Sequence, residues 1–363
     1  MLCTKNVTVT KIINETNDIQ TLTVDGGCGS AVLYKAYFPR VEPGDKVKIN
    51  VTATQLNLGT GGFDFVMNVE DRKSHSIGEQ KGHIIKGRYL PIQHSMLTVE
   101  SPEQHLEAPY FNQKLNLNGK PILLCELHSM LPVLWGLFEE NDKEGNLIAI
   151  IDDSAALALP VSNHLQSLKT NSRMATISIG QAFGGDFEAI NLVTALQFVM
   201  NIDPKATVVV TVGPGGVGTA TRYGFSAIRM AEWANIIGKG NGNPIWTPRL
   251  SEADKRERHL GLSHHTMTAL TEFTYAKSVL TLPVGEQADR YLMESVKKLE
   301  QFSHVEVIKV CENLIKEWVE RSLSNTGPIH SMGRSFQEDP LYFSGVGTAL
   351  YYLFEYEKKR AFR

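Results

Sequence analysis

The pattern of apolar and polar positions changes near residue 110. Before that point, short β-rich runs alternate with turn residues, and residues 100–110 read as a linker. Val47, Ile49 and Val51 occupy every second position, with Lys48 and Asn50 between them, which is the period of a half-buried strand. The runs 6–13, 19–24, 30–38, 46–56 and 63–70 therefore predict a small antiparallel β-barrel-like domain or sandwich over residues 1–110.

Residues 111–363 alternate continuous apolar runs with segments of helical periodicity. Buried strands are expected at 121–126, 147–152, 174–179, 207–212, 244–248, 278–283 and 305–310. Helices are expected at 188–201, 218–237, 267–273, 286–301 and 312–323, and from Pro340 to about residue 357. Such alternation predicts an α/β fold, a doubly wound, mostly parallel Rossmann-like sheet with helices on both faces.

Composition and charge exclude several classes of protein. Hydrophobic residues make up 42% of the chain, too many for a disordered protein. The formal net charge of −3 argues against a generally basic nucleic-acid coat, so we expect no nucleic-acid partner.

The sequence also predicts a cytoplasmic location. Residues 1–18 have no apolar core behind a basic start, so they do not resemble a signal peptide. The most apolar stretch, residues 122–138, is interrupted by Glu126, His128 and Pro132, and we expect no membrane partner. The four cysteines lie far apart, which predicts separate reduced thiols.

Polar and glycine-rich residues follow the expected strands at their carboxyl ends, where ligands bind in open α/β sheets. The sharpest motif is Gly213-x-Gly215-x-x-Gly218, which follows a strongly β-prone run. Glycines let a backbone turn tightly and approach a phosphate, whose charge then meets free N–H groups and a helix N-terminus. We therefore expect a small phosphorylated ligand, with a nucleotide or dinucleotide as the candidate cofactor. The residues expected to hold it are Gly213, Gly215, Gly216, Gly218, Thr219 and Arg249.

Three features weaken a dinucleotide interpretation of this loop. It follows the fourth expected strand of its domain, Pro214 has no N–H, and no acidic residue ends the next strand. That strand ends instead at Arg249, which suits a phosphate better than a ribose hydroxyl. The alternative is that the glycines only permit a tight, packed turn, and the sequence leaves both interpretations open.

His128, Asp153 and His264 are the candidates for proton transfer. His264 and His265 are adjacent, so at most one of them is expected to face a shared pocket. With His128 and nearby aspartates they supply metal-ligand chemistry. However, no H-x-x-x-H or H-E-x-x-H spacing occurs, so our prediction assigns no metal site.

Two further segments have a simpler interpretation. Asp186, after the glycines that follow the third expected strand, reads as the N-cap of the next helix, with a ligand or cation contact as the alternative. Residues 255–259, Lys-Arg-Glu-Arg-His, read as a solvated charged segment whose basic side offers guidance to an anionic ligand.

The chain resembles a bacterial family of uncharacterised proteins, domain of unknown function 3866. The resemblance rests on five motifs: Gly82-His-Ile-Ile-Lys-Gly-Arg-Tyr89, Gly180-Gln-Ala-Phe-Gly-Gly-Asp186, Gly213-Pro-Gly-x-Val-Gly-Thr219, Ser263-His-His-Thr266 and Met332-Gly-Arg334. Leu90 departs from the threonine expected there. The resemblance implies one intact protein of this length, and it implies no activity. In the first motif, we expect Lys86 and Arg88 either to close over the sheet edge or to belong to a strand bonded to the second domain.

The leading functional hypothesis is an enzyme that acts on a small phosphorylated or nucleotide-like ligand at the carboxyl edge of the sheet. The alternative is a non-catalytic ligand sensor or regulatory protein that uses the same pocket. A third hypothesis is a structural protein that forms homo-oligomers through its aromatic-rich C-terminal helix. Burial of these aromatic side chains within one chain is the simpler explanation for their presence.

Overall fold

The computed structural model describes residues 2–58, 61–70, 82–103, 109–169, 171–324 and 329–361. The chain groups into two compact units. One contains Met1–Lys81, Gly87–Met96 and Pro160–Asn163, and the other contains Gly82–Lys86, Leu97–Leu159 and His164–Arg363. Residues 104–108 of the expected linker lie outside the described residues.

The first unit contains a closed five-stranded barrel with strand order β1-β2-β3-β5-β4. Its strands are β1 (Thr4–Glu15), β2 (Ile19–Val24), β3 (Ser30–Tyr34), β4 (Lys46–Asn50) and β5 (Asp64–Val69). Val47 and Ile49 are fully buried in its core, as their alternation predicts. The barrel is not wholly antiparallel, because β3 and β5 run parallel. The expected strand 46–56 is also too long, since a short helix, α1 (Thr52–Gln55), follows β4.

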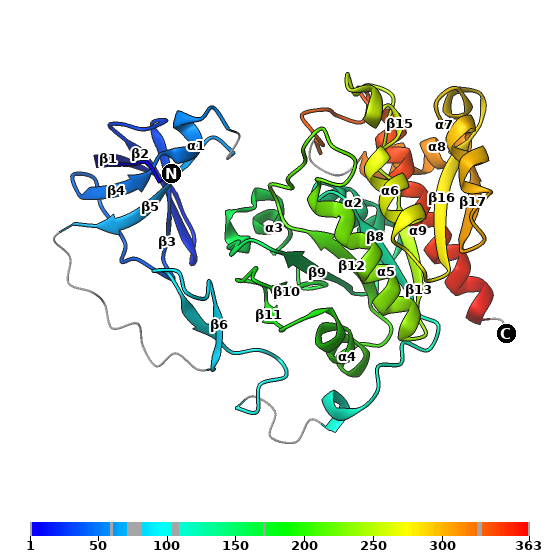
Figure 1. Ribbon diagram of the computed structural model, residues 1–363, viewed down its shortest axis with the longest axis horizontal. Helices are drawn as coiled ribbons and strands as arrows, with labels where there is room; N and C mark the ends of the chain where they lie inside the picture. Colours follow the sequence, from blue (N-terminus) through cyan, green and yellow to red (C-terminus); the bar gives the residue numbers. More distant parts are fainter. Residues whose placement is uncertain are drawn as a thin grey trace. The chain divides into compact units, whose positions relative to one another are not determined.

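The second unit is built on an eight-stranded, all-parallel sheet with order β11-β10-β9-β12-β8-β13-β16-β17 (Figure 1). These strands are β8 (Pro121–Cys125), β9 (Leu147–Asp153), β10 (Met174–Gly180), β11 (Phe187–Glu188), β12 (Thr207–Val212), β13 (Asn243–Thr247), β16 (Ser278–Val284) and β17 (Val305–Cys311). The seven longer strands start and end within about one residue of their predicted bounds. The strand β11 was not predicted, because two residues are too few to show an alternation of apolar and polar positions.

Helices cover both faces of this sheet, which confirms the doubly wound α/β prediction (Figure 1). Alternate residues of β8 face opposite layers, Ile122 and Leu124 on one side and Leu123 and Cys125 on the other. The first layer contains α4 (Leu192–Ile202), α5 (Met230–Lys239), α6 (His264–Glu272) and α7 (Glu286–Leu299). The second contains α2 (Met130–Asn141), α3 (Asn163–Leu168), α8 (Glu312–Leu323) and α9 (Pro340–Ala361).

The remaining elements are short. They are the 3-10 turns η1 (Pro109–Asn112), η2 (Leu159–Val161), η3 (Ser226–Arg229) and η4 (Glu257–His259), and the strands β6 (Ile84–Lys86), β7 (His94–Met96), β14 (Leu250–Ser251) and β15 (Gly261–Leu262). The antiparallel pair β14–β15 folds residues 252–260 back toward the start of α6.

Several helix predictions are wrong at their starts. The helix expected at 218–237 begins at Met230 after η3, so no α-helix follows the Gly213–Thr219 segment directly. The helix expected from residue 188 begins at Leu192, and its N-cap is Asn191, whose side chain accepts hydrogen bonds from the Val193 and Thr194 amides. Asp186 is therefore not an N-cap.

Asp186 instead ties the end of its loop to β10. Its carboxylate accepts hydrogen bonds from the backbone amide and the hydroxyl of Thr176, at 2.8 and 2.7 Å. Two donors from one strand residue give this carboxylate a structural role.

Lys86 is likewise a structural group rather than a free cation. Its side chain is 1% exposed, and Nζ lies 2.6 Å from Glu188 Oε2 and 2.5 Å from the Ala182 carbonyl oxygen. Glu188 therefore neutralises Lys86 within the second unit, which fits the alternative that this segment is bonded to the second domain.

All four cysteines are free thiols, as predicted. Tyr351, Tyr352 and Phe354 of α9 are partly buried against the core of their own chain. Among the helices that the structure describes, none has both the length and the apolar character needed to cross a bilayer.

Candidate functional site

A cavity of about 620 Å³ lies at the carboxyl ends of β8, β12 and β13. It belongs to the second unit and is lined by segments that follow these strands and by loops further along the chain. The lining residues with polar or glycine character are Glu126, His128, Ser129, His164, Gly213, Gly215, Gly216, Gly218, Thr219, Ser226, Arg249, Arg256, Arg258, His259, His265, His330 and Gly333. All six residues predicted to hold the ligand are among them, and of the three proton-transfer candidates only His128 is.

Glu126 organises the floor of this cavity. Its side chain is 1% exposed, and it accepts hydrogen bonds from Arg249 Nη1 at 2.9 Å, His265 Nδ1 at 3.0 Å and Thr266 Oγ1 at 2.7 Å. Burial alone would raise the pKa of Glu126, but the His265 hydrogen bond and the Arg249 charge outweigh it and hold this pKa below its usual value. Glu126 is therefore a carboxylate, and Arg249, one of the predicted anion-binding residues, is already paired with it.

The glycine loop, residues 213–219, leaves space and backbone N–H groups that an anion could use. Gly215 has φ +86°, which favours glycine, and a Cβ there would meet no atom within 4 Å. Within the described chain, the amides of Gly215 and Gly216 donate no hydrogen bond to another residue. Because the loop continues into a second turn, where Gly218 bridges to Phe225, it lacks the helix N-terminus of a dinucleotide fingerprint.

Three arginines line the cavity, and their pairing differs. Arg249 is paired with Glu126, and Arg256 Nη2 lies 2.7 Å from Asp254 Oδ2. Arg258 donates from Nε to His259 Nε2 at 3.3 Å, and no carboxylate in the described part of the chain pairs with it. Arg258 therefore carries the positive charge that is available to an anionic ligand. Arg258 belongs to the charged segment 255–259, which we interpreted from the sequence as solvated, with guidance of an anionic ligand as the alternative.

His128 and Asp153, two proton-transfer candidates, contact the residues at the start of the glycine loop, His128 at Val212 and Asp153 at Gly213. Burial lowers the pKa of His128 to about 4, with help from nearby His164, and its Nδ1 lies 3.3 Å from the Val212 carbonyl oxygen. Burial raises the pKa of Asp153, whose carboxylate accepts hydrogen bonds from the Ala155 and Gly213 amides. Asp153 therefore anchors the first residue of the loop and does not line the cavity.

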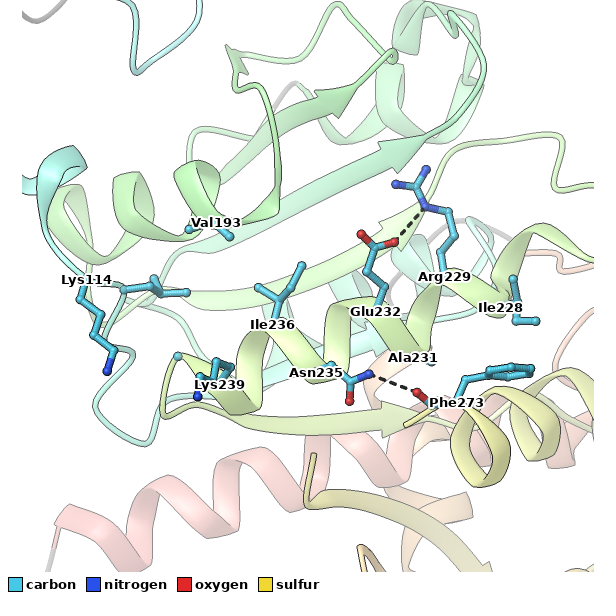
Figure 2. Close-up of a pocket in the computed structure, with 12 residues that line it drawn as sticks. Lys114, Val193, Ile228, Arg229, Ala231, Glu232, Asn235, Ile236, Lys239 and Phe273 are labelled. Atoms are coloured by element: carbon cyan, nitrogen blue, oxygen red, sulfur yellow. Dashed lines mark hydrogen bonds and ion pairs between the residues drawn. The ribbon is translucent and has the colours of Figure 1, made fainter. Parts of the chain in front are cut away.

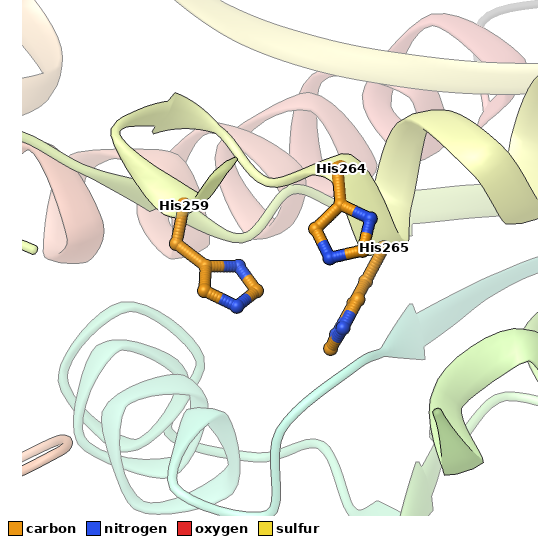
Figure 3. A group of neighbouring side chains, drawn as sticks. All are labelled: His259, His264 and His265. Atoms are coloured by element: carbon orange, nitrogen blue, oxygen red, sulfur yellow. The ribbon is translucent and has the colours of Figure 1, made fainter. Parts of the chain in front are cut away.

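His264, the third candidate, belongs to a cluster with His259 and His265 (Figure 3). One ring nitrogen from each of the three lies within 4.8 Å of the others. His265 lines the cavity and His264 does not, which agrees with the expectation that at most one of them faces it. Burial lowers the pKa of His264 and lowers that of His259 to about 3, so His259 and His264 are neutral near pH 7.

Sequence reasoning missed His259 as a member of this cluster. Residue 259 stands five positions before His264 inside a charged segment, a spacing that matches no ligand motif. The β14–β15 pair brings it to the first turn of α6, where Ser263 caps the helix and its hydroxyl lies 2.9 Å from His259 Nδ1. Only the pairing of these two short strands reveals the contact.

A second pocket, of about 710 Å³, lies along α5 and is mostly apolar (Figure 2). Arg229 and Glu232 point toward each other at its rim, and Arg229 Nη2 also lies 2.9 Å from Asp152 Oδ2. Trp233 Nε1 donates to the same carboxylate at 2.8 Å. None of the predicted site residues lines this pocket.

Comparison with known proteins gives a family and no activity. No curated protein matches the chain. The model of one family, described as "Protein of unknown function (DUF3866)", matches residues 30–350. The matched span contains the whole parallel sheet and every residue that lines the carboxyl-edge cavity. The chain therefore belongs to the DUF3866 family of proteins of unknown function.

Proposed function

We propose that the chain is an enzyme that binds a small phosphorylated or nucleotide-like ligand in the carboxyl-edge cavity. The observation that carries this proposal is a set of donors that line one cavity: the Gly215 and Gly216 amides, which donate no hydrogen bond within the described chain, and the Arg258 guanidinium, which no described carboxylate neutralises. Backbone amides in a glycine turn form a concave site for anions, and arginine recognises phosphate through two parallel hydrogen bonds. The volume, about 620 Å³, suits a small-molecule ligand.

The charge of the cavity supports an anionic ligand. Glu126 is the one acidic residue among the described residues that line it, and its charge is balanced by Arg249. Arg256 is balanced by Asp254, which leaves Arg258 as a net positive charge. A phosphate dianion fits this field.

Catalysis rather than simple binding is supported by the Glu126–His265 pair. The carboxylate holds the Nδ1 proton of His265 and so directs the Nε2 lone pair away from itself. His265 Nε2 is buried and has no hydrogen-bond partner within the described chain. A ring oriented in this way acts either as a general base toward a hydroxyl or water, or as a metal ligand.

The proposal is tested by thermal unfolding with matched pairs of phosphorylated and unphosphorylated compounds, such as AMP with adenosine and glucose 6-phosphate with glucose, and with inorganic pyrophosphate. A ligand at 100 times its Kd stabilises the fold by about 2.7 kcal/mol, so only phosphorylated members should raise Tm. Arg258→Gln should reduce the shift. Arg290→Gln, which removes an exposed arginine of α7, should not.

Two outcomes decide between the candidate functions. Conversion of the stabilising compound on incubation with the protein supports an enzyme, and its recovery unchanged supports the non-catalytic sensor. Equal stabilisation of wild type and Arg258→Gln by every phosphorylated compound would refute the anion site itself.

A further inference from the structure

We propose that His259, His264 and His265 bind one divalent transition-metal ion, with zinc as the best match, at the wall of the carboxyl-edge cavity. The metal site does not depend on the proposed phosphorylated ligand. Three features support it: the placement of the three rings, the partners of their outer nitrogens, and the open side of the cluster.

The local fold gathers three imidazoles from two short segments (Figure 3). Ser263 caps α6, so His264 and His265 occupy its first turn, and β15 places His259 beside them. The ring centroids are 5.2 Å apart for His259 and His264, 4.8 Å for His259 and His265, and 4.4 Å for His264 and His265. Nitrogens bound to one tetrahedral zinc lie about 3.4 Å apart, so small side-chain rotations complete the set.

The outer nitrogens of two rings are held as metal-binding histidines require. His265 Nδ1 donates to Glu126 Oε1 at 3.0 Å, because a carboxylate oxygen can only accept, and this leaves Nε2 of His265 as a lone pair. His259 Nδ1 lies 2.9 Å from Ser263 Oγ, and since Arg258 donates to His259 Nε2, Nε2 is the lone pair of this ring as well. A carboxylate behind a histidine is a common support for a bound zinc, because it orients the ring and increases its basicity.

The inner nitrogens lack partners that would explain their burial. His264 Nε2 and His265 Nε2 are both buried, and neither makes a hydrogen bond within the described chain. Buried polar atoms are normally paired, so two adjacent exceptions on neighbouring rings point to a missing partner. Phe225 stacks on His265 with ring centroids 3.9 Å apart and an angle of 6° between the planes, which keeps this ring in place.

The third inner nitrogen, His259 Nε2, accepts a hydrogen bond from Arg258 at 3.3 Å. Arg258 is largely exposed, so its side chain can leave when a metal takes this lone pair. Three histidine ligands with a fourth position open to a cavity are typical of catalytic rather than structural zinc sites. His259 and His265 both line the cavity, so the open position faces the same space as the glycine loop.

Cobalt(II) binding to the chelator-treated full chain tests the proposal without any phosphorylated compound. We expect one Co²⁺ per chain, visible absorption bands of a tetrahedral complex, and displacement by Zn²⁺. His259→Ala and His264→Ala should each weaken binding at least tenfold. His164→Ala, which removes another histidine of the same cavity, should leave it unchanged.

Far-ultraviolet circular dichroism of each metal-free variant identifies any that fails to fold, and the other variant then decides. Stoichiometric Co²⁺ binding that survives in a folded His259→Ala or His264→Ala protein would overturn the assignment, as would a wild type that binds no Co²⁺. Because the titration contains no phosphate, its failure leaves the anion site untouched, and failure of the anion site leaves the metal site untouched.

Discussion

Replacement of Glu126 by glutamine should destabilise the second unit strongly, although it changes only one atom of the side chain. In the wild type, Glu126 is 1% exposed and accepts three hydrogen bonds, and the Arg249 side chain that it neutralises is 8% exposed. Glutamine removes the charge and turns an NH₂ group toward groups that are themselves donors. The Arg249 guanidinium is then buried without a counterion.

Two estimates of the cost agree. Opposite charges about 4 Å apart attract by about 4 kcal/mol at an effective dielectric constant of 20. Loss of one partner of a buried ion pair typically costs about 3–5 kcal/mol, because it leaves the other charge uncompensated. We therefore expect Glu126→Gln to lower the free energy of unfolding by about 4 kcal/mol.

Chemical denaturation, monitored by tryptophan fluorescence, measures this change because all four tryptophans lie in the second unit. Glu286→Gln is the matched control, since its ion pair with Arg290 is largely exposed, and it should leave the midpoint unchanged. Adding Arg249→Met to Glu126→Gln should recover part of the loss, because the uncompensated charge disappears. A Glu126→Gln protein that unfolds at the wild-type midpoint would refute the argument that this carboxylate is charged and paired.

Three further predictions follow from buried or strained positions. Lys86→Met should lower the free energy of unfolding by about 3–5 kcal/mol in a denaturant titration, because it leaves the buried Glu188 carboxylate without a counterion. The double variant Lys86→Met with Glu188→Leu should lose less stability, because it removes both charges. The folded pKa of His128, about 4, lies below its unfolded value, so the unfolded chain takes up a proton first as the pH falls from 6.5 to 4. The free energy of unfolding of the wild type should therefore fall by ~3 kcal/mol over this pH range because of His128. Urea unfolding at a series of pH values measures this loss, and the His128→Asn protein should not show it. Gly261→Ala should lower Tm more than Gly333→Ala does. Both glycines have positive φ, but only a Cβ at 261 would meet a backbone oxygen of α7, at 2.5 Å; equal losses would contradict this.

The parallel sheet could be predicted from sequence because its strands are buried on both faces. Val208, Val209 and Val210 form a continuous apolar run with no polar interruption, and such a run has few alternatives to a central strand. The same reasoning fails for the segment after β12. Phe225, Ile228 and Trp233 continue at helical spacing, yet the chain before them makes a turn in which Thr219 bonds to Gly224.

The candidate site was only partly predictable. The rule that ligands bind at the carboxyl ends of parallel strands pointed to the glycine loop and Arg249, and both line a cavity at this edge. Neither the neutralisation of Arg249 by Glu126 nor the approach of His259 to His264 has a sequence signal. Both depend on contacts between segments that only the completed fold brings together.

The most direct test of the anion site is a crystal structure of the protein with the phosphorylated compound that raises Tm most. The account predicts phosphoryl oxygens within hydrogen-bond distance of the Gly215 and Gly216 amides and of the Arg258 guanidinium. A compound bound in the pocket along α5, with these donors turned away from it, would contradict the account.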